Sequence, residues 1–139
     1  MFLLAERYRG KVQAFEIWNE PNFAREWGTV HAGAPNEYLQ MLRLGYRAVK
    51  EGNPDAIVVS GALTPTGIND PAIAVDDKVY LQRLLSINQG EAARYFDALG
   101  VHVTAGPNAP DDSVASPTHS RAICNGGWAN HSSFFFTRY

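Results

Sequence analysis

One short segment of the chain combines residue types that can carry acid–base chemistry. The segment is Trp18-Asn19-Glu20-Pro21-Asn22, and it follows a β-branched and aromatic run over residues 12–18 that is typical of a strand. A glutamate at this point can protonate a leaving-group oxygen if its surroundings hold its pKa near the working pH. The amide of Asn19 beside it can hydrogen-bond a hydroxyl group. The segment therefore predicts a site at the end of a strand.

Several aromatic and acidic side chains near this segment can belong to the same site. Glu16, Trp18 and Glu20 have the same parity on an extended strand, so Glu16 is expected on the same face as Glu20 but lower down. For Glu16 we favour a structural role, as a buried carboxylate paired with a basic neighbour. Trp18 is expected in the core or in the wall of the site. Trp27 and Trp128, both expected in loops, are candidates for carbohydrate contact or for incidental packing.

The elements that must position these residues alternate along the chain. Helices are predicted over residues 2–9, 36–51 and 76–87, with a further helical stretch over 91–96, and strands over 12–18, 56–60 and 98–103. The run at 56–60 is almost wholly apolar, as expected for a strand that is buried on both faces of a parallel sheet. This order indicates βαβ units and a parallel sheet, either closed as a barrel or open and doubly wound.

The C-terminal part of the sequence has a different character. Residues 107–133 predict a long loop, because Pro and Gly occur there among Asn, Asp and Ser. Phe134-Phe135-Phe136 predict the start of a helix over residues 134–139. The first and last elements look incomplete, and three strands cannot close a barrel. We therefore expect residues 1–139 to be a fragment of one larger domain, with helix–strand repeats over residues 1–106.

Composition and charge narrow the function classes. The chain is 45% hydrophobic and 19% charged, which is typical of a packed globular protein. Its net charge is −2 and no stretch gathers Lys and Arg, so we expect no nucleic-acid partner. No apolar run approaches the roughly 20 residues that span a bilayer, so no membrane association is expected. The single cysteine, Cys124, excludes an internal disulfide, and His31, His119 and His131 lack metal-ligand spacing. The cellular compartment stays open.

Three segments resemble one enzyme family. The first, Phe15-Glu16-Ile17-Trp18-Asn19-Glu20-Pro21-Asn22, resembles the fourth-strand signature of clan A glycoside hydrolases, which include cellulases, mannanases and β-xylosidases. Ile57-Val58-Val59-Ser60-Gly61 is similar to the fifth strand of these enzymes, and Phe96-Asp97-Ala98-Leu99-Gly100-Val101-His102 to the sixth. The resemblance implies an α/β fold, a partial (β/α)8 TIM barrel whose parallel strands alternate with helices. The chain would then be a fragment of one glycoside hydrolase catalytic domain.

The resemblance also implies an activity and roles for particular residues. It implies hydrolysis of the O-glycosyl bonds of a polysaccharide or oligosaccharide by a retaining double displacement, without a metal or another cofactor. By the same similarity, Glu20 is the general acid/base, Asn19 binds the 2-hydroxyl of the sugar, and His102 lines the site. For each of these three residues a structural role is the competing interpretation: a surface glutamate, a turn-capping amide and a buried core histidine.

The sequence departs from the family at two points. Thr104 occupies a position, two residues after His102, where family members often carry Tyr. The nucleophilic Glu of the family lies on the seventh strand, and no carboxylate follows Asp112 in this chain. A retaining mechanism needs two carboxylates about 5 Å apart. We therefore expect the isolated fragment to be inactive.

Other interpretations remain open from the sequence alone. One is a carbohydrate-binding protein without catalysis, and another is an open parallel-sheet domain whose strand-end loops bind a different ligand. The second lacks support from a Gly-rich phosphate loop, because residues 61–67 do not end in Lys followed by Ser or Thr. The partner of such a fragment would be the missing remainder of the barrel. Because its strand edges are unpaired, we expect the isolated fragment to self-associate.

Overall fold

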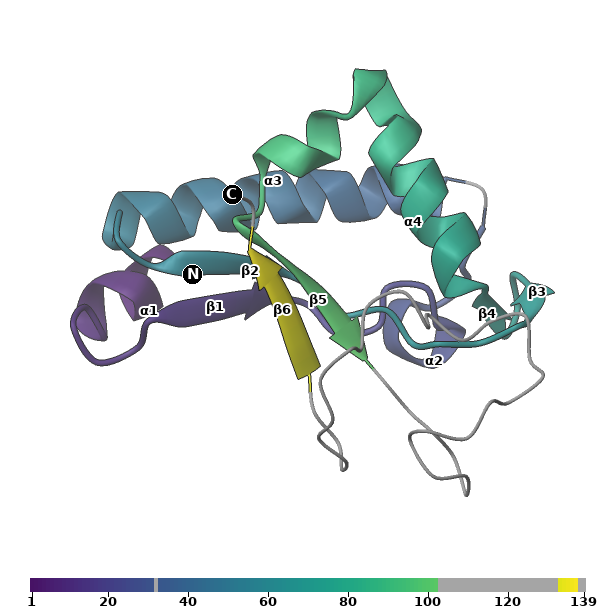
Figure 1. The fold of residues 1–139 in the computed structure, drawn as a ribbon, viewed down its shortest axis with the longest axis horizontal. Coiled ribbons are helices and arrows are strands. Elements are labelled where there is room, and N and C mark those ends of the chain that lie inside the picture. Colours follow the sequence, from purple (N-terminus) through teal and green to yellow (C-terminus); the bar gives the residue numbers. More distant parts are fainter. Residues whose placement is uncertain (32, 103–132, 138–139) are drawn as a thin grey trace.

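The computed structural model describes residues 1–31, 33–102 and 133–137 and combines helices with strands (Figure 1). The α-helices are α1 (Phe2–Arg7), α2 (Ala24–Trp27), α3 (Ala34–Gly52) and α4 (Asp77–Ser86), followed by the 3-10 turns η1 (Ile87–Gln89) and η2 (Glu91–Arg94). The strands are β1 (Ala14–Ile17), β2 (Ile57–Ser60), β3 (Asn69–Asp70), β4 (Ala74–Val75), β5 (Ala98–His102) and β6 (Ser133–Thr137).

The main sheet has the strand order β1-β2-β5-β6, and its first three strands are parallel. β1 and β2 pair in the register Ala14↔Ile57 to Ile17↔Ser60, and Val59 of β2 pairs with Ala98 of β5. These are the three strands predicted from the sequence, so the α/β class with a parallel sheet is confirmed. The carboxyl ends of all three strands consequently lie at one edge of the sheet.

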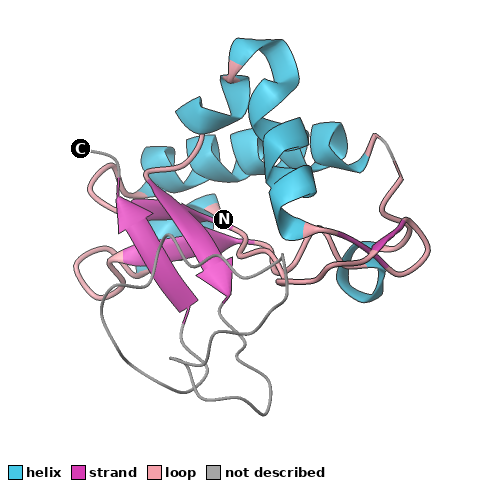
Figure 2. Cartoon of the chain, turned by 45° about the vertical axis from the view of Figure 1, so that its right-hand side comes forward, coloured by secondary structure: helices cyan, strands magenta, loops and turns pink. Residues whose placement is uncertain are grey.

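The long helices lie on one side of this sheet (Figure 2). α3 packs on β1 and β2, and both α1 and α4 pack on α3. The buried stripe of α3 consists of Tyr38, Leu39, Leu42 and Val49, whose spacing follows the helical period. The approach to β1 is close, because a Cβ at position 45 would lie 2.9 Å from Cδ1 of Ile17. The core therefore fills the space between the helices and one face of the sheet.

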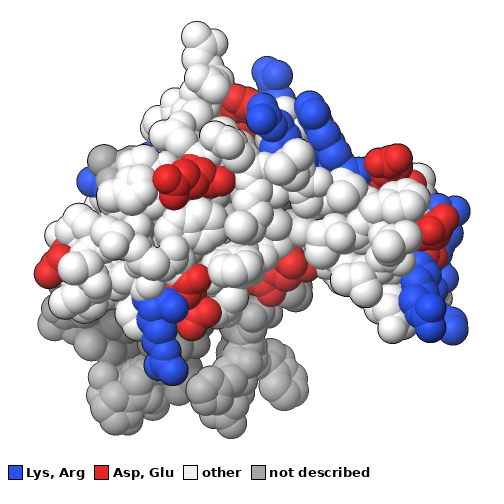
Figure 3. Space-filling view, turned by 180° about the vertical axis from the view of Figure 1, so that it is seen from behind, with Lys and Arg blue, Asp and Glu red and all other residues white. Residues whose placement is uncertain are grey.

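A polar network holds the amino ends of β2 and β5. Asp97, immediately before β5, accepts a hydrogen bond of 2.8 Å from the Val58 N–H and forms an ion pair of 2.7 Å with Lys50. The Lys50 ammonium also donates to the carbonyl of Ala56 over 2.7 Å. On the back of the molecule relative to Figure 1, other acidic and basic side chains also lie next to one another (Figure 3). Asp97 thus joins β2, β5 and α3 at the end of the sheet opposite to His102.

The prediction of a helix starting at Phe134 is wrong. Residues 133–137 form β6, which pairs antiparallel with β5 from Ala98↔Thr137 to His102↔Ser133. Aromatic residues favour strands, and the second edge of β5 offers the backbone groups that complete a ladder. The predicted loop over 107–133 lies outside the described residues except at its last position, which belongs to β6.

Smaller elements were also not predicted. The stretch over 91–96 contains a 3-10 turn instead of an α-helix, and the loop after β2 contains the antiparallel pair β3 and β4. In the parts of the chain that the structure describes, no helix has both the length and the apolar character needed to cross a bilayer.

Candidate active site

Glu20 lies in a strained turn just beyond β1. The strand ends at Ile17, and two non-glycine residues after it adopt a positive φ, 72° at Trp18 and 44° at Glu20. Such conformations cost about 1–3 kcal/mol each and persist only where the surroundings impose them. Here the Glu20 N–H donates a 2.9 Å hydrogen bond to the carbonyl of Ala62, just beyond β2. The turn is therefore fixed by the neighbouring strand end.

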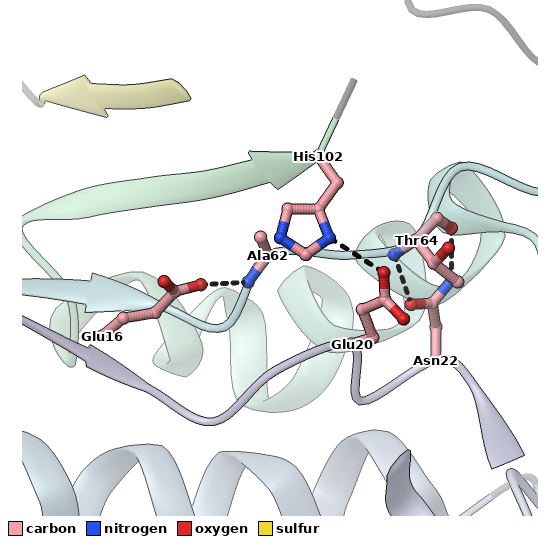
Figure 4. Close-up of polar contacts among 6 residues, drawn as sticks. All are labelled: Glu16, Glu20, Asn22, Ala62, Thr64 and His102. Carbon is pink, nitrogen blue, oxygen red and sulfur yellow. Dashed lines mark hydrogen bonds and ion pairs between the residues drawn. The ribbon is translucent and has the colours of Figure 1, made fainter. Parts of the chain in front are cut away.

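The structure brings Glu20 and His102 together. Nδ1 of His102, the last residue of β5, lies 2.9 Å from Oε1 of Glu20 (Figure 4). The two side chains are 23% and 20% exposed, so solvent reaches the pair while most of its surface is covered. Because β2 lies between β1 and β5, the contact spans the carboxyl ends of three parallel strands.

The geometry of this pair leaves one carboxylate oxygen for proton transfer. A histidine with hydrogen on Nδ1 donates it to Oε1 of Glu20. That bond persists whether the other oxygen, Oε2, carries a proton or not. The arrangement can therefore hold the carboxyl group in one orientation while Oε2 releases and recovers a proton, which is what a general acid/base must do.

Asn22 anchors the loop that carries Glu20, a role that the sequence analysis did not assign. Its side chain is 0% exposed, and Nδ2 donates to the carbonyls of Thr64 and Val75 over 2.8 and 2.9 Å. Oδ1 accepts from the Thr64 N–H over 2.9 Å. The available signal was an amide next to Pro21 among apolar residues, but its partners lie more than 40 positions away. Asn22 therefore joins the loops that follow β1 and β2.

Tyr38 ties the ends of β1 and β2 to α3, and it was also missed. Its hydroxyl donates to the carbonyl of Ile17 over 3.1 Å and accepts from the Gly61 N–H over 2.6 Å. Burial raises the pKa of the Tyr38 hydroxyl, so it stays protonated. The strand ends approach closely, since a Cβ at position 61 would lie 2.8 Å from the carbonyl oxygen of Trp18. The signal in the sequence was the spacing of Tyr38 four residues before Leu42.

Glu16 does not form the buried pair with a basic residue that the sequence predicted. Its side chain is exposed, and Oε1 accepts a 2.9 Å hydrogen bond from the Ala62 N–H. The reason is local: β2 ends at Ser60, so this N–H has no ladder partner and the nearby carboxylate satisfies it. Figure 4 shows the bond from the Ala62 N–H to Glu16, and the Glu20 N–H binds the carbonyl of the same residue.

The tryptophans form a chain of edge contacts beside the turn. Trp18 lies outside the core, with 47% of its surface exposed. It meets Trp27 of α2 at 90° with ring centroids 5.9 Å apart, and Trp27 meets Tyr38 at 85° over the same distance. The indole N–H of Trp27 also donates a hydrogen bond of 3.3 Å to the carboxylate of Glu37. The strand ends before Trp18, so its side chain turns toward α2 and does not continue the row of Glu16.

The remaining candidates are dispersed. Asn19 is exposed in the turn, and Trp128 lies outside the described residues. The same holds for Thr104, Asp111, Asp112, His119, Cys124 and His131. His31 is exposed, and its Nε2 lies 3.2 Å from Glu37. Within residues 1–31, 33–102 and 133–137, no group of three or more His, Cys, Asp or Glu is arranged to hold a metal ion.

Comparisons of the chain with protein-family models, with curated proteins and with solved structures find no match in any of the three. The fold and the site define an α/β chain whose paired glutamate and histidine lie at the carboxyl ends of two parallel strands, β1 and β5, with β2 between them. Its function is accordingly inferred from these residues and their geometry.

Proposed function

We propose that the chain is part of a retaining glycoside hydrolase in which Glu20 is the general acid/base. The observation that carries this proposal is the 2.9 Å contact between Glu20 and His102 across the ends of β1, β2 and β5. Catalytic groups of βα-barrel enzymes project from this end of the strands. The substrate class is a glycan with an O-glycosyl bond, as the resemblance of the Trp18–Asn22 segment implies.

The topology supports a partial TIM barrel as the fold of this enzyme. β1, β2 and β5 follow one another in the sheet in chain order, and α1, α3 and α4 lie on one side of it (Figure 2). Doubly wound sheets instead have helices on both faces. The antiparallel β6 departs from a regular barrel, and it occupies the edge that the next parallel strand would take.

The proposed reaction assigns a proton transfer to each step. In the first step, Oε2 of Glu20 gives its proton to the glycosidic oxygen while the bond to the anomeric carbon breaks and a carboxylate nucleophile forms a glycosyl ester. In the second step, the Glu20 carboxylate takes a proton from water, whose oxygen attacks the anomeric carbon and releases the ester. His102 holds Oε1 in both steps, and Asn19 binds the 2-hydroxyl of the sugar.

The nucleophile of this reaction must come from outside the described residues. The two carboxylates of a retaining enzyme lie about 5 Å apart. Glu16 is engaged with the Ala62 N–H, and Asp97 lies at the opposite end of β5. We therefore propose that another segment supplies the nucleophile, and that residues 1–139 alone have no hydrolytic turnover.

The test compares aryl glycosides with good and poor leaving groups, using the longest polypeptide that the reading frame around residues 1–139 encodes. Glu20→Gln keeps the size of the side chain but removes the proton donor. For poor leaving groups we expect a loss of kcat/KM of about 10²–10⁴. For a leaving group that needs no protonation, the rate of the bond-breaking step should decrease much less. An equal loss for both substrates would contradict the assignment of Glu20.

A second experiment uses residues 1–139 alone. We expect no release of aryl alcohol above background, because the family's nucleophile lies on a seventh strand and no carboxylate follows Asp112 in residues 1–139. Turnover that disappears in Glu20→Gln would show that this segment is catalytically complete. Oligosaccharide binding by the longest gene product without hydrolysis would favour the non-catalytic carbohydrate-binding protein instead.

A further inference from the structure

We infer that Trp18 is a stacking platform for a second sugar ring beside the bond that Glu20 protonates. The substrate is then a glycan of at least two pyranose units. This inference rests on the proposed function and deepens it, because it names a binding residue and a minimum length of substrate for the same site.

The first observation is that the structure holds Trp18 in an unfavourable state. Trp18 is 47% exposed, although burying an aromatic side chain is one of the largest favourable contributions to folding. Its backbone φ of 72° adds strain that a glycine would not have. Neither feature stabilises the described chain, and backbone strain of this kind is concentrated at active sites and ligand contacts.

The second observation is that a contact with Trp27 fixes the orientation of the Trp18 ring. Trp27 meets Trp18 at 90°, so whichever of the two presents its edge, at least one face of Trp18 is free of Trp27. Trp27 is held in turn by Tyr38 and by its hydrogen bond to Glu37. A pyranose ring with equatorial hydroxyls exposes a face of C–H groups, and this apolar face is complementary to an indole ring.

The third observation is the position of Trp18 relative to Glu20. Two residue steps separate their Cα atoms, which therefore lie at most about 7 Å apart. The side chains diverge from there: Glu20 reaches across β2 to His102, and Trp18 turns toward α2. A glycan can thus run from His102 across Glu20 to Trp18, with consecutive rings at the two residues.

A competing explanation is that a polypeptide segment covers Trp18. β1 is the first strand of the sheet, so its outer edge is open among the described residues. A strand added at that edge could bury the indole. In that case Trp18 would contribute to assembly or stability and not to sugar binding, and the binding measurements below separate the two roles.

The test measures binding of xylose, xylobiose, glucose and cellobiose to residues 1–139 by NMR titration. At least one disaccharide should bind about tenfold more tightly than its monosaccharide, as one aromatic contact of about 1.4 kcal/mol allows. Trp18→Ala should abolish this preference, Trp18→Phe should keep most of it, and Tyr8→Ala, which removes an exposed aromatic residue after α1, should keep it as the control. Thermal unfolding of each variant checks that the fold persists.

Two results would overturn the platform: an unchanged disaccharide preference in Trp18→Ala, or no preference in the unmodified chain. Failure of the leaving-group test with an intact disaccharide preference would remove the proposed hydrolysis while the sugar platform stands. The failures of the two proposals can therefore be told apart.

Discussion

Replacement of Asn22 by Ala should strongly destabilise the chain. The substitution removes three hydrogen bonds from a side chain that is 0% exposed, and it leaves the Thr64 N–H and the carbonyls of Thr64 and Val75 without this partner. A buried polar group left unsatisfied costs about 1–3 kcal/mol. Allowing for partial hydration of these groups, the expected loss is roughly 3–5 kcal/mol, a large share of the 5–15 kcal/mol typical of a domain.

Asn22→Asp separates the loss of hydrogen bonds from the loss of volume. The aspartate can still accept from the Thr64 N–H, but as a carboxylate it faces two carbonyl oxygens that Nδ2 now serves. Burial and these oxygens should raise its pKa above the usual value of about 3.9. Stability is then lost as the pH rises through the raised pKa, so the variant should be least stable at neutral pH and recover toward pH 4.

Urea unfolding followed by circular dichroism measures both effects, with Asn19→Ala as the matched control. Asn19 belongs to the same turn but is exposed, so its replacement should change the free energy of unfolding by less than about 0.5 kcal/mol. A loss below 1 kcal/mol for Asn22→Ala would refute the reasoning, as would a pH-independent defect in Asn22→Asp. Either result would mean that the two loops are joined by other contacts.

Three further substitutions test other parts of the structure. Burial, and then the charge of Asp76, raises the pKa of Asp77 above 3.8, so stability is lost as the pH rises through the raised pKa. Asp77→Asn should therefore have the higher Tm at pH 7 and a smaller decrease in Tm from pH 4 to pH 7 than the unmodified chain. Parallel pH profiles of Tm for the two proteins would contradict this. Gly100→Ala would place a Cβ in a steric clash with the carbonyl oxygen of Ser60, so it should cost about 3 kcal/mol or more in urea unfolding. A tolerated alanine would disprove the close approach of β2 and β5. Gln89→Gly relieves the strain of a φ of 58° and should stabilise the chain by about 0.5–1 kcal/mol in thermal unfolding. Arg83→Gly, in the helix α4, is the control that should destabilise it. A loss of stability in Gln89→Gly would exclude strain at this position.

The sequence predicted the elements whose signal is local. The stripe from Leu39 to Val49 repeats at the helical period, and the apolar run at 56–60 matches β2 within one residue. The helix expected at Phe134 failed because three consecutive phenylalanines have no period that separates helix from strand. The position of β6 depends on the open edge of β5, which is remote in the sequence.

The candidate site was predictable only in part for the same reason. The Trp18–Asn22 segment and His102 were identifiable by resemblance and by position at strand ends. The neighbouring Pro21 and the helical spacing could point to Asn22 and Tyr38 as residues, but their hydrogen-bond partners are distant in the sequence and could not be predicted from it. The error at Glu16 arose because a buried carboxylate was expected, whereas the free Ala62 N–H binds it at the surface.

The most direct test of Glu20 as acid/base adds azide to the Glu20→Ala form of the longest gene product, with an activated aryl glycoside as substrate. Azide needs no general base, so it can attack the glycosyl ester that water can no longer hydrolyse efficiently. We predict that azide restores turnover and yields a glycosyl azide with the anomeric configuration of the substrate. Failure of azide to accelerate turnover, or a product of inverted configuration, would contradict the account.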